Sequence, residues 1–259
     1  MAVSIMKRWG GTRLPPVHIS ESRGIRTLHI GGDAIQSAMR LADPDALELH
    51  YTRAMMAFLL LVPEPRDVLL IGLGGGSIAR FLRHRCAASR IVAIELNPQV
   101  VAAARAWFGL PPDDARLRVD IADGLAYVPA HPQCCDVLML DAFEDGRSVP
   151  ALSTFRYYQH CRRALRAGGL LVQNFMSDER RLAAYVARVE TAFDGRVLQL
   201  PAANRVNTIV FAANGLAASW SLATLEKRAA VLERRLHLPY RAMLKRLVDA
   251  NRSGGLIEG

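Results

Sequence analysis

Apolar stretches alternate with helix-like patterns over most of the chain. Every residue from Val68 to Ile71 is apolar, as in a strand that is buried on both faces of a parallel sheet. After Ser77 the apolar residues recur three and four positions apart, which is typical of a helix packed on one face. The alternation predicts a doubly wound, parallel α/β sheet. The expected strands are 68–72, 91–95, 117–121, 137–141, 170–174, 196–200 and 208–212, with helices at 77–84, 98–108, 153–167 and 178–193 and a short helix after residue 124.

Shorter apolar stretches precede this domain. Three of them, separated by turn residues, predict a small β-meander. A helix is expected next, with Asp45 as its N-cap and Glu48 as the capping-box partner, and Pro63 should end it. The expected meander strands are 17–20, 25–30 and 34–39.

The C-terminal part has the pattern of an amphipathic helix. Between residues 221 and 252, leucine and alanine side chains recur three and four positions apart, and Pro239 should break the helix. Basic residues outnumber acidic ones there, which we interpret as a solvated helix face. We divide the chain into an N-terminal β-meander and helix (1–62), an α/β domain (63–215) and a C-terminal helical extension (216–259).

Composition narrows the classes of function. The net charge is +9, but the arginines are scattered and no aromatic residues interleave them as a stacking surface, so we expect no nucleic-acid partner. The longest apolar stretch, Ala54–Val62, is far shorter than the roughly 20 residues of a membrane helix. No apolar run follows Lys7 and Arg8 as it would in a signal peptide. The four cysteines include no C-x-x-C pair, so a zinc site or disulfide framework is not indicated. We expect a cytoplasmic protein without a membrane segment or a metal.

A glycine-rich turn connects the first strand of the α/β domain to its first helix. It contains Gly72, Gly74, Gly75 and Gly76. Glycine permits a tight turn and a close approach of a ligand to the backbone, and the helix that follows offers unpaired N–H groups. The turn therefore favours a nucleotide-like ligand, with an ordinary strand–helix turn as the alternative.

Acidic residues stand at the ends of the next three strands. Glu95 ends the second strand, 19 residues beyond Gly76, where a carboxylate accepts hydrogen bonds from the ribose hydroxyls of NAD or of an adenosyl group. Asp123 follows the third strand and can accept from an adenine amino group, and Asp141 ends the fourth. Ligands of such sheets bind outside the carboxyl ends of the strands, so the three carboxylates should face one site. A surface turn or a helix cap is the alternative for each.

These pieces together resemble a known family. They are the turn 69–76, the run Ile94-Glu95-Leu96-Asn97-Pro98, Asp123-Gly124, Leu140-Asp141, and Tyr157-Tyr158 ahead of Gly168-Gly169. In this combination the chain resembles the spermidine synthase (polyamine aminopropyltransferase) family of S-adenosylmethionine-dependent Rossmann transferases, as a divergent branch. The resemblance implies a Rossmann-type, methyltransferase-like domain that moves an aminopropyl group from decarboxylated S-adenosylmethionine to a small-molecule amine.

The resemblance also assigns roles to residues. It makes Asp141 the carboxylate that holds and deprotonates the amine, assisted by Glu144, which stands where the family usually has a second Asp. Tyr51 and Tyr157 would contact the substrate. The donor would be bound by Gly72, Gly74, Gly75, Gly76, Glu95, Asp123 and Gly124.

Two departures from the family pattern leave other functions open. Gly75 stands where the family usually has an Asp that meets the donor's amine, and Tyr51-Thr52-Arg53 keeps only the Tyr of a Tyr-His-Glu or Tyr-Gln-Glu run. The alternatives are methyl transfer from intact S-adenosylmethionine and a non-catalytic module that binds an adenosyl ligand. An NAD dehydrogenase is a further alternative, but it leaves Asp123 unexplained. The acceptor and a homodimeric state remain open.

Overall fold

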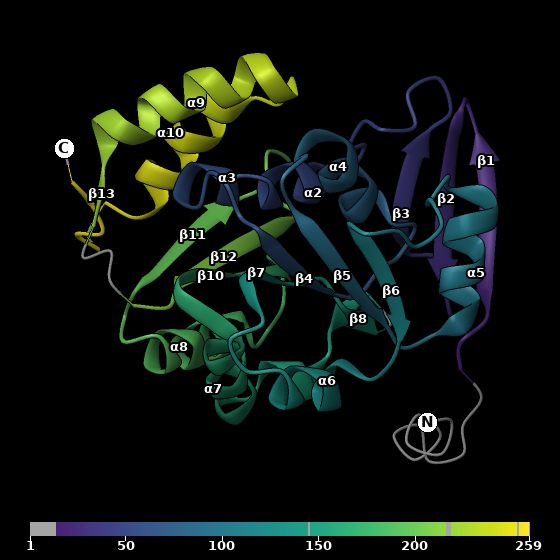
Figure 1. Ribbon diagram of the computed structural model, residues 1–259, viewed down its shortest axis with the longest axis horizontal. Helices are drawn as coiled ribbons and strands as arrows, with labels where there is room; N and C mark the ends of the chain where they lie inside the picture. The colour runs from purple at the N-terminus through teal and green to yellow at the C-terminus, as the bar shows by residue number, and fades with distance from the viewer. Residues whose placement is uncertain (1–13, 145, 216–218, 253, 259) are drawn as a thin grey trace.

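The computed structural model describes residues 14–144, 146–215, 219–252 and 254–258. Its centre is a seven-stranded sheet in the order β11-β12-β10-β7-β4-β5-β6, shown in Figure 1. Each strand predicted for the α/β domain overlaps one of these seven. They are β4 (Asp67–Ile71), β5 (Arg90–Glu95), β6 (Leu117–Ile121), β7 (Cys135–Leu140), β10 (Leu165–Met176), β11 (Val197–Pro201) and β12 (Asn207–Ala213).

The direction of one strand differs from the prediction. The pairs β10–β7, β7–β4, β4–β5 and β5–β6 are parallel, whereas β12 is antiparallel to both β10 and β11. The sheet is therefore mixed rather than wholly parallel. The link between β11 and β12 is too short for a crossover helix, so it can join these strands only as a hairpin.

Helices cover both faces of the sheet, which explains the unbroken apolar run in β4. Val68 and Leu70 pack into one core, and Leu69 and Ile71 pack into a second core on the opposite face. The second core is closed by α6 (Gly124–Ala130), α7 (Phe155–Ala164) and α8 (Leu182–Ala192), and the first by α2 (His50–Met55), α3 (Phe58–Leu61), α4 (Ser77–Arg85), α9 (Leu222–Leu236) and α10 (Tyr240–Ala250).

The N-terminal meander is confirmed and packs beside the sheet. Its strands are β1 (Val17–Ser22), β2 (Ile25–Ile30) and β3 (Ile35–Arg40), in that order. Leu28 and Met39 of the meander form a small core with Val100 and Ala103 of α5 (Pro98–Trp107). The helix α5 contacts β1 of the meander as well as β5 and β6 of the sheet, and in Figure 1 it overlaps the meander strands.

The expected helix start at Asp45 is wrong. The helix α2 begins at His50, with Leu49 at its N-cap and no side-chain cap. The Asp45 carboxylate lies instead 3.6 Å from the buried Arg80 guanidinium and 2.8 Å from the His84 ring. Glu48 pairs with Arg40 at 3.0 Å, so both acids are used in tertiary ion pairs that the local pattern does not reveal.

The helix expected at 153–167 is also shorter than predicted. Thr154 caps the N-terminus of α7, and the helix ends at Ala164 because β10 begins at Leu165 and pairs there with Cys135 of β7. A register irregularity follows before the pairing resumes at Leu170. The side chain of Asn214 holds this bend by donating to the carbonyl oxygens of residues 162, 165 and 166 at 3.2, 3.0 and 3.1 Å.

The C-terminal helices are confirmed, including the break near Pro239. Leu225 and Leu232 of α9 and Leu244 of α10 belong to the same core as β4. The hydroxyl of Tyr240 donates to the Met56 carbonyl oxygen at 3.2 Å, which ties the tail to the N-terminal helices.

Small pairings complete the described chain: β8 (Phe143–Glu144) with β9 (Arg147–Ser148), and β13 (Trp220–Ser221) with β14 (Ile257–Glu258). The segment boundaries at 62/63 and 215/216 stay a prediction. Within the described ranges, none of the helices has the length and apolarity needed to cross a bilayer.

Candidate active site

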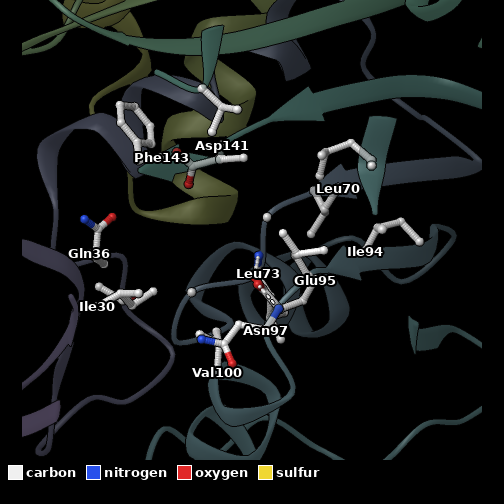
Figure 2. A pocket seen from close by; sticks show the side chains of 18 of the residues that line it. Ile30, Gln36, Leu70, Leu73, Ile94, Glu95, Asn97, Val100, Asp141 and Phe143 are labelled. Carbon is white, nitrogen blue, oxygen red and sulfur yellow. Dashed lines mark hydrogen bonds between the residues drawn. The ribbon is translucent and has the colours of Figure 1, made fainter. Parts of the chain in front are cut away.

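The site lies where the order of the strands reverses. The chain runs outward from β4 through β5 to β6, and then returns to β7 on the other side of β4. At such a point the connections leave in opposite directions and a crevice opens at the carboxyl ends of the strands. A pocket occupies this crevice, and Figure 2 shows Glu95 and Asp141 in its wall. Gln36 and Ser37 of the meander and Tyr51 of α2 close it from the other side.

The glycine turn forms one wall of the pocket, but its four glycines differ in position and in contacts. Gly72 and Gly74 line the pocket, and both have positive φ, +96° and +55°, which glycine adopts without strain. Gly75 is not among the lining residues, and a Cβ there would lie 2.8 Å from Ser37 Oγ and 2.9 Å from Phe108 Cδ1. Gly76 is the N-cap of α4 and packs against Leu110. Contact with a ligand is therefore expected from Gly72 and Gly74.

Glu95 is fixed by the backbone on both of its oxygens. Oε2 accepts from the Leu73 N–H at 3.0 Å and Oε1 from the Asn97 N–H at 2.9 Å. Burial raises the pKa of this carboxyl, and the backbone donors, with Asn97 and Leu73 first among them, act in the opposite direction. The carboxylate is thus held in one orientation at the rim of the turn, where its remaining lone pairs can accept from two neighbouring hydroxyls.

Asp141 is the second carboxylate of the pocket, just beyond the end of β7. Burial raises the pKa of this group to about 6, against hydrogen bonds from Asn174 and Tyr51 that lower it. Asn174 Nδ2 donates to Asp141 Oδ1 at 2.9 Å. The Tyr51 hydroxyl lies 3.3 Å from the Gln36 carbonyl oxygen. Burial and the nearby Asp141 carboxyl raise the pKa of Tyr51. A carboxyl with a pKa near the working pH suits a general base.

The other predicted residues are placed less directly. Asp123 is the N-cap of α6, where Oδ1 accepts from the Leu125 N–H at 2.9 Å, and it stands beside the lining residues Ala122 and Gly124. Tyr157 is buried but does not line the pocket. Its hydroxyl donates to the Gly124 carbonyl oxygen at 3.2 Å and so stabilises the loop that does.

Glu144 cannot be placed in the site. Its backbone pairs with Arg147 in the β8–β9 hairpin, but its side chain lies outside the described part of the structure. No group of three or more His, Cys, Asp or Glu side chains in the described residues is arranged to hold a metal ion.

Several pocket residues were missed by sequence reasoning. Ser37 and Ser77 bring their hydroxyls within 3.2 Å of each other in the pocket wall, and Phe143, Val149 and Leu152 make an apolar side of it. Asn174, which donates to Asp141 from outside the pocket lining, could have been found, because it ends a predicted strand on the ligand side of the sheet. The meander residues could not, since no local pattern says that this meander folds over the pocket.

Comparisons with known proteins indicate the family and the fold of the chain. The family model for the spermine/spermidine synthase domain matches residues 48–187. A polyamine aminopropyltransferase of Chromobacterium violaceum is 40% identical over 238 residues, which are 92% of this chain and 91% of the relative. Human methyltransferase-like protein 13, solved in complex with SAH, is 28% identical over 73% of this chain and 93% of its own, with a TM-score of 0.66. A spermidine synthase solved with the transition-state analogue AdoDATO covers 95% of this chain and 86% of its own at a TM-score of 0.71; at 19% identity this match shows the shared fold.

Proposed function

This chain belongs to the spermine/spermidine synthase family, whose members transfer aminopropyl groups, and from that membership we propose its reaction. It transfers an aminopropyl group from decarboxylated S-adenosylmethionine to the nitrogen of a small amine. The observation that carries the proposal is the pairing of two carboxylates in one pocket: Glu95, fixed by the backbone beside the glycine turn, and Asp141, with its pKa raised to about 6.

The donor is held by the part of the pocket around the glycine turn. Gly72 and Gly74 let its adenosyl group lie against the backbone, and Glu95 accepts from its ribose hydroxyls. The loop at Gly124 receives the adenine, with Asp123 beside it. This arrangement directs the sulfonium toward the side of the pocket where Asp141 stands.

Asp141 holds the acceptor and removes its proton. The neutral amine nitrogen forms a bond to the donor carbon next to the sulfonium, and the C–S bond breaks. The electron pair of that bond neutralises the sulfur, which leaves as the thioether methylthioadenosine. The Asp141 carboxylate takes up the proton that the alkylated nitrogen loses, and Tyr51, within hydrogen-bonding reach of Asp141, orients the carboxylate. The apolar side chains around the amine keep water from competing for it.

One observation supports methyl transfer as a second candidate. A Cβ at Gly75 would collide with Ser37 Oγ and Phe108 Cδ1, so the Asp that the family usually has at this position does not fit unless these side chains shift. The similarity to human methyltransferase-like protein 13 fits the same reading. In that case the same carboxylates would bind intact S-adenosylmethionine and the acceptor amine.

The two candidates are separated by donor binding and turnover together. Each donor is added to the purified protein at about a hundred times its dissociation constant, where a bound ligand adds ~2.7 kcal/mol to stability and raises the melting temperature. Turnover is then followed with a panel of diamines and polyamines. Aminopropyl transfer requires that the decarboxylated donor be consumed only when an amine is present. Consumption of intact S-adenosylmethionine instead would support the methyltransferase, and stabilisation without turnover by either donor would overturn both.

A further inference from the structure

Two buried asparagines form a chain of hydrogen bonds that ends on Asp141. Asn174 lies near the end of β10 and is 3% exposed, and Asn207 begins β12 and is 6% exposed. Asn207 Nδ2 donates to Asn174 Oδ1 at 3.0 Å, and Asn174 Nδ2 donates to Asp141 Oδ1 at 2.9 Å. Neither asparagine is among the residues that line the pocket, so neither is placed to touch a substrate.

The direction of this chain follows from which atoms can pair. Because Asn207 donates to the Asn174 oxygen, the Asn174 amide must turn its nitrogen toward Asp141. The reversed amide would set its oxygen against the Asp141 carboxylate and its nitrogen against the Asn207 nitrogen. Buried polar atoms that face like atoms lose their hydrogen bonds and pay the full cost of desolvation. Asn207 therefore fixes the orientation of Asn174, and Asn174 fixes one oxygen of Asp141.

The groups around Asp141 show why neutral donors matter here. Asn174 from β10 and Tyr51 from α2 are the two groups that act on the carboxyl against the effect of burial, and neither is a cation. Among the described residues that line the pocket, the titratable groups besides Asp141 are Tyr51 and Glu95 of β5, and Glu95 is an acid. The ionised form of Asp141 thus depends on hydrogen bonds rather than on an ion pair.

We propose that Asn174 and Asn207 are positioning residues of the active site, which hold the Asp141 carboxylate through its Oδ1 in the orientation that receives the acceptor amine. This inference rests on the proposed function for its catalytic meaning, but its structural content concerns Asp141 alone. Asn174 is the direct donor, and Asn207 acts through it. Through this relay β10 and β12 influence the chemistry at the end of β7.

The test replaces each amide with an apolar side chain of similar size, which adds no charge. The variants are Asn174→Leu, Asn207→Leu and the matched control Asn214→Leu. Asn214 directly follows β12, and its amide nitrogen donates to the backbone carbonyls of residues 162, 165 and 166 rather than to Asp141. The titration of Asp141 is followed directly by carbon-13 NMR of aspartate carboxyls, assigned with Asp141→Asn, and the pH dependence of turnover is measured in parallel.

We expect Asn174→Leu to move the Asp141 titration upward by about one pH unit, the size of one lost hydrogen bond to a charged group. Asn207→Leu should move it in the same direction by less, because Asn174 keeps its donor but loses its fixed orientation. Asn214→Leu should lower the melting temperature without moving the titration. The acid limb of the turnover profile should shift with the titration, and turnover should approach that of the wild type at high pH.

An unchanged Asp141 titration in folded Asn174→Leu would overturn the inference. Should that variant fail to fold, Asn174→Ala and Asn207→Ser serve the same comparison. Because the NMR titration needs no substrate, a shift without any turnover would support the relay and count against the proposed function. Turnover in the wild type with no shift in the variants would support the function and overturn the relay.

Discussion

Gly72 and Asp141 are in direct backbone contact: a Cβ placed on Gly72 would lie 2.8 Å from the carbonyl carbon of Asp141 and closer still to its oxygen. The Asp141 N–H also donates to the Ile71 carbonyl oxygen at 2.9 Å. The turn that we propose to bind the donor and the residue that we propose to bind the acceptor are therefore in direct backbone contact. A change in the backbone of the turn is expected to displace Asp141 as well.

Gly72→Ala should impair catalysis more than its backbone strain alone would. The added methyl group must push the Asp141 backbone aside, and a displacement of about 1 Å at a catalytic group can cost ~10²-fold in rate. The measurement is kcat together with the melting temperature. Gly195→Ala is the control, because Gly195 has φ +74° and nothing within 4 Å of an added Cβ. Equal activity in the two variants would show that the contact has no catalytic consequence.

Glu95→Gln should weaken donor binding. The amide removes the charge that ribose hydroxyls donate to, and its nitrogen would face a backbone N–H of Leu73 or Asn97. The loss should be ~1–3 kcal/mol, the scale of a hydrogen bond to a charged group, measured by calorimetry with each donor. Glu48→Gln makes the same chemical change in the exposed pair with Arg40 and should leave affinity unchanged. A normal affinity in Glu95→Gln would remove Glu95 from the donor site.

Asp141→Asn should stabilise the protein at alkaline pH. Burial raises the carboxyl pKa from 3.8 to about 6, so the folded state disfavours the ionised form. This penalty is absent when the group is protonated in both states and grows as the pH rises from about 4 to about 6. The amide never ionises, so the gain in unfolding free energy should be about 2–3 kcal/mol larger at pH 8 than at pH 4. Urea denaturation at the two pH values measures it, and a gain that does not change with pH would contradict the assignment.

The turnover of the wild type should fall as the pH falls through about 6, since protonated Asp141 cannot accept the proton of the amine. Below that pH the rate should drop about tenfold per pH unit, as for a single titrating base. The profile is measured as kcat/KM at each pH, because kcat/KM reports the pKa of the free enzyme, to which the value of about 6 refers. In Asp141→Asn the residual rate, ~10²–10⁴ lower, should lack this limb. A limb that persists in the variant would assign the titration to another group.

The parts of the structure that the sequence could predict are those decided by local burial. The strand β4 is recognisable because both of its faces are covered, which demands an apolar residue at every position from Val68 to Ile71. Glu95 and Asp141 line one pocket, which could be expected because the carboxyl ends of parallel strands share an edge. These inferences need no knowledge of distant contacts.

The remaining features depend on tertiary contacts. Asp45 has the type and spacing of an N-cap, but the buried charge of Arg80 requires a partner and Asp45 supplies it. Ser37 reaches the pocket because the meander packs on α5, and no residue pattern specifies that docking. The sequence pattern predicts that Gly75 belongs to a ligand-binding loop. In the structure Phe108 packs against Gly75 at a distance that leaves no room for a side chain.

The central claim is aminopropyl transfer, and identification of the products from a mixed-donor reaction tests it most directly. The protein is incubated with equal amounts of S-adenosylmethionine and its decarboxylated form and with a panel of amines, and the products are identified by mass spectrometry beside those of Asp141→Asn. The account predicts methylthioadenosine and an aminopropylated amine from the wild type, and little of either from the variant. S-adenosylhomocysteine with a methylated amine, or no product from either donor, would contradict it.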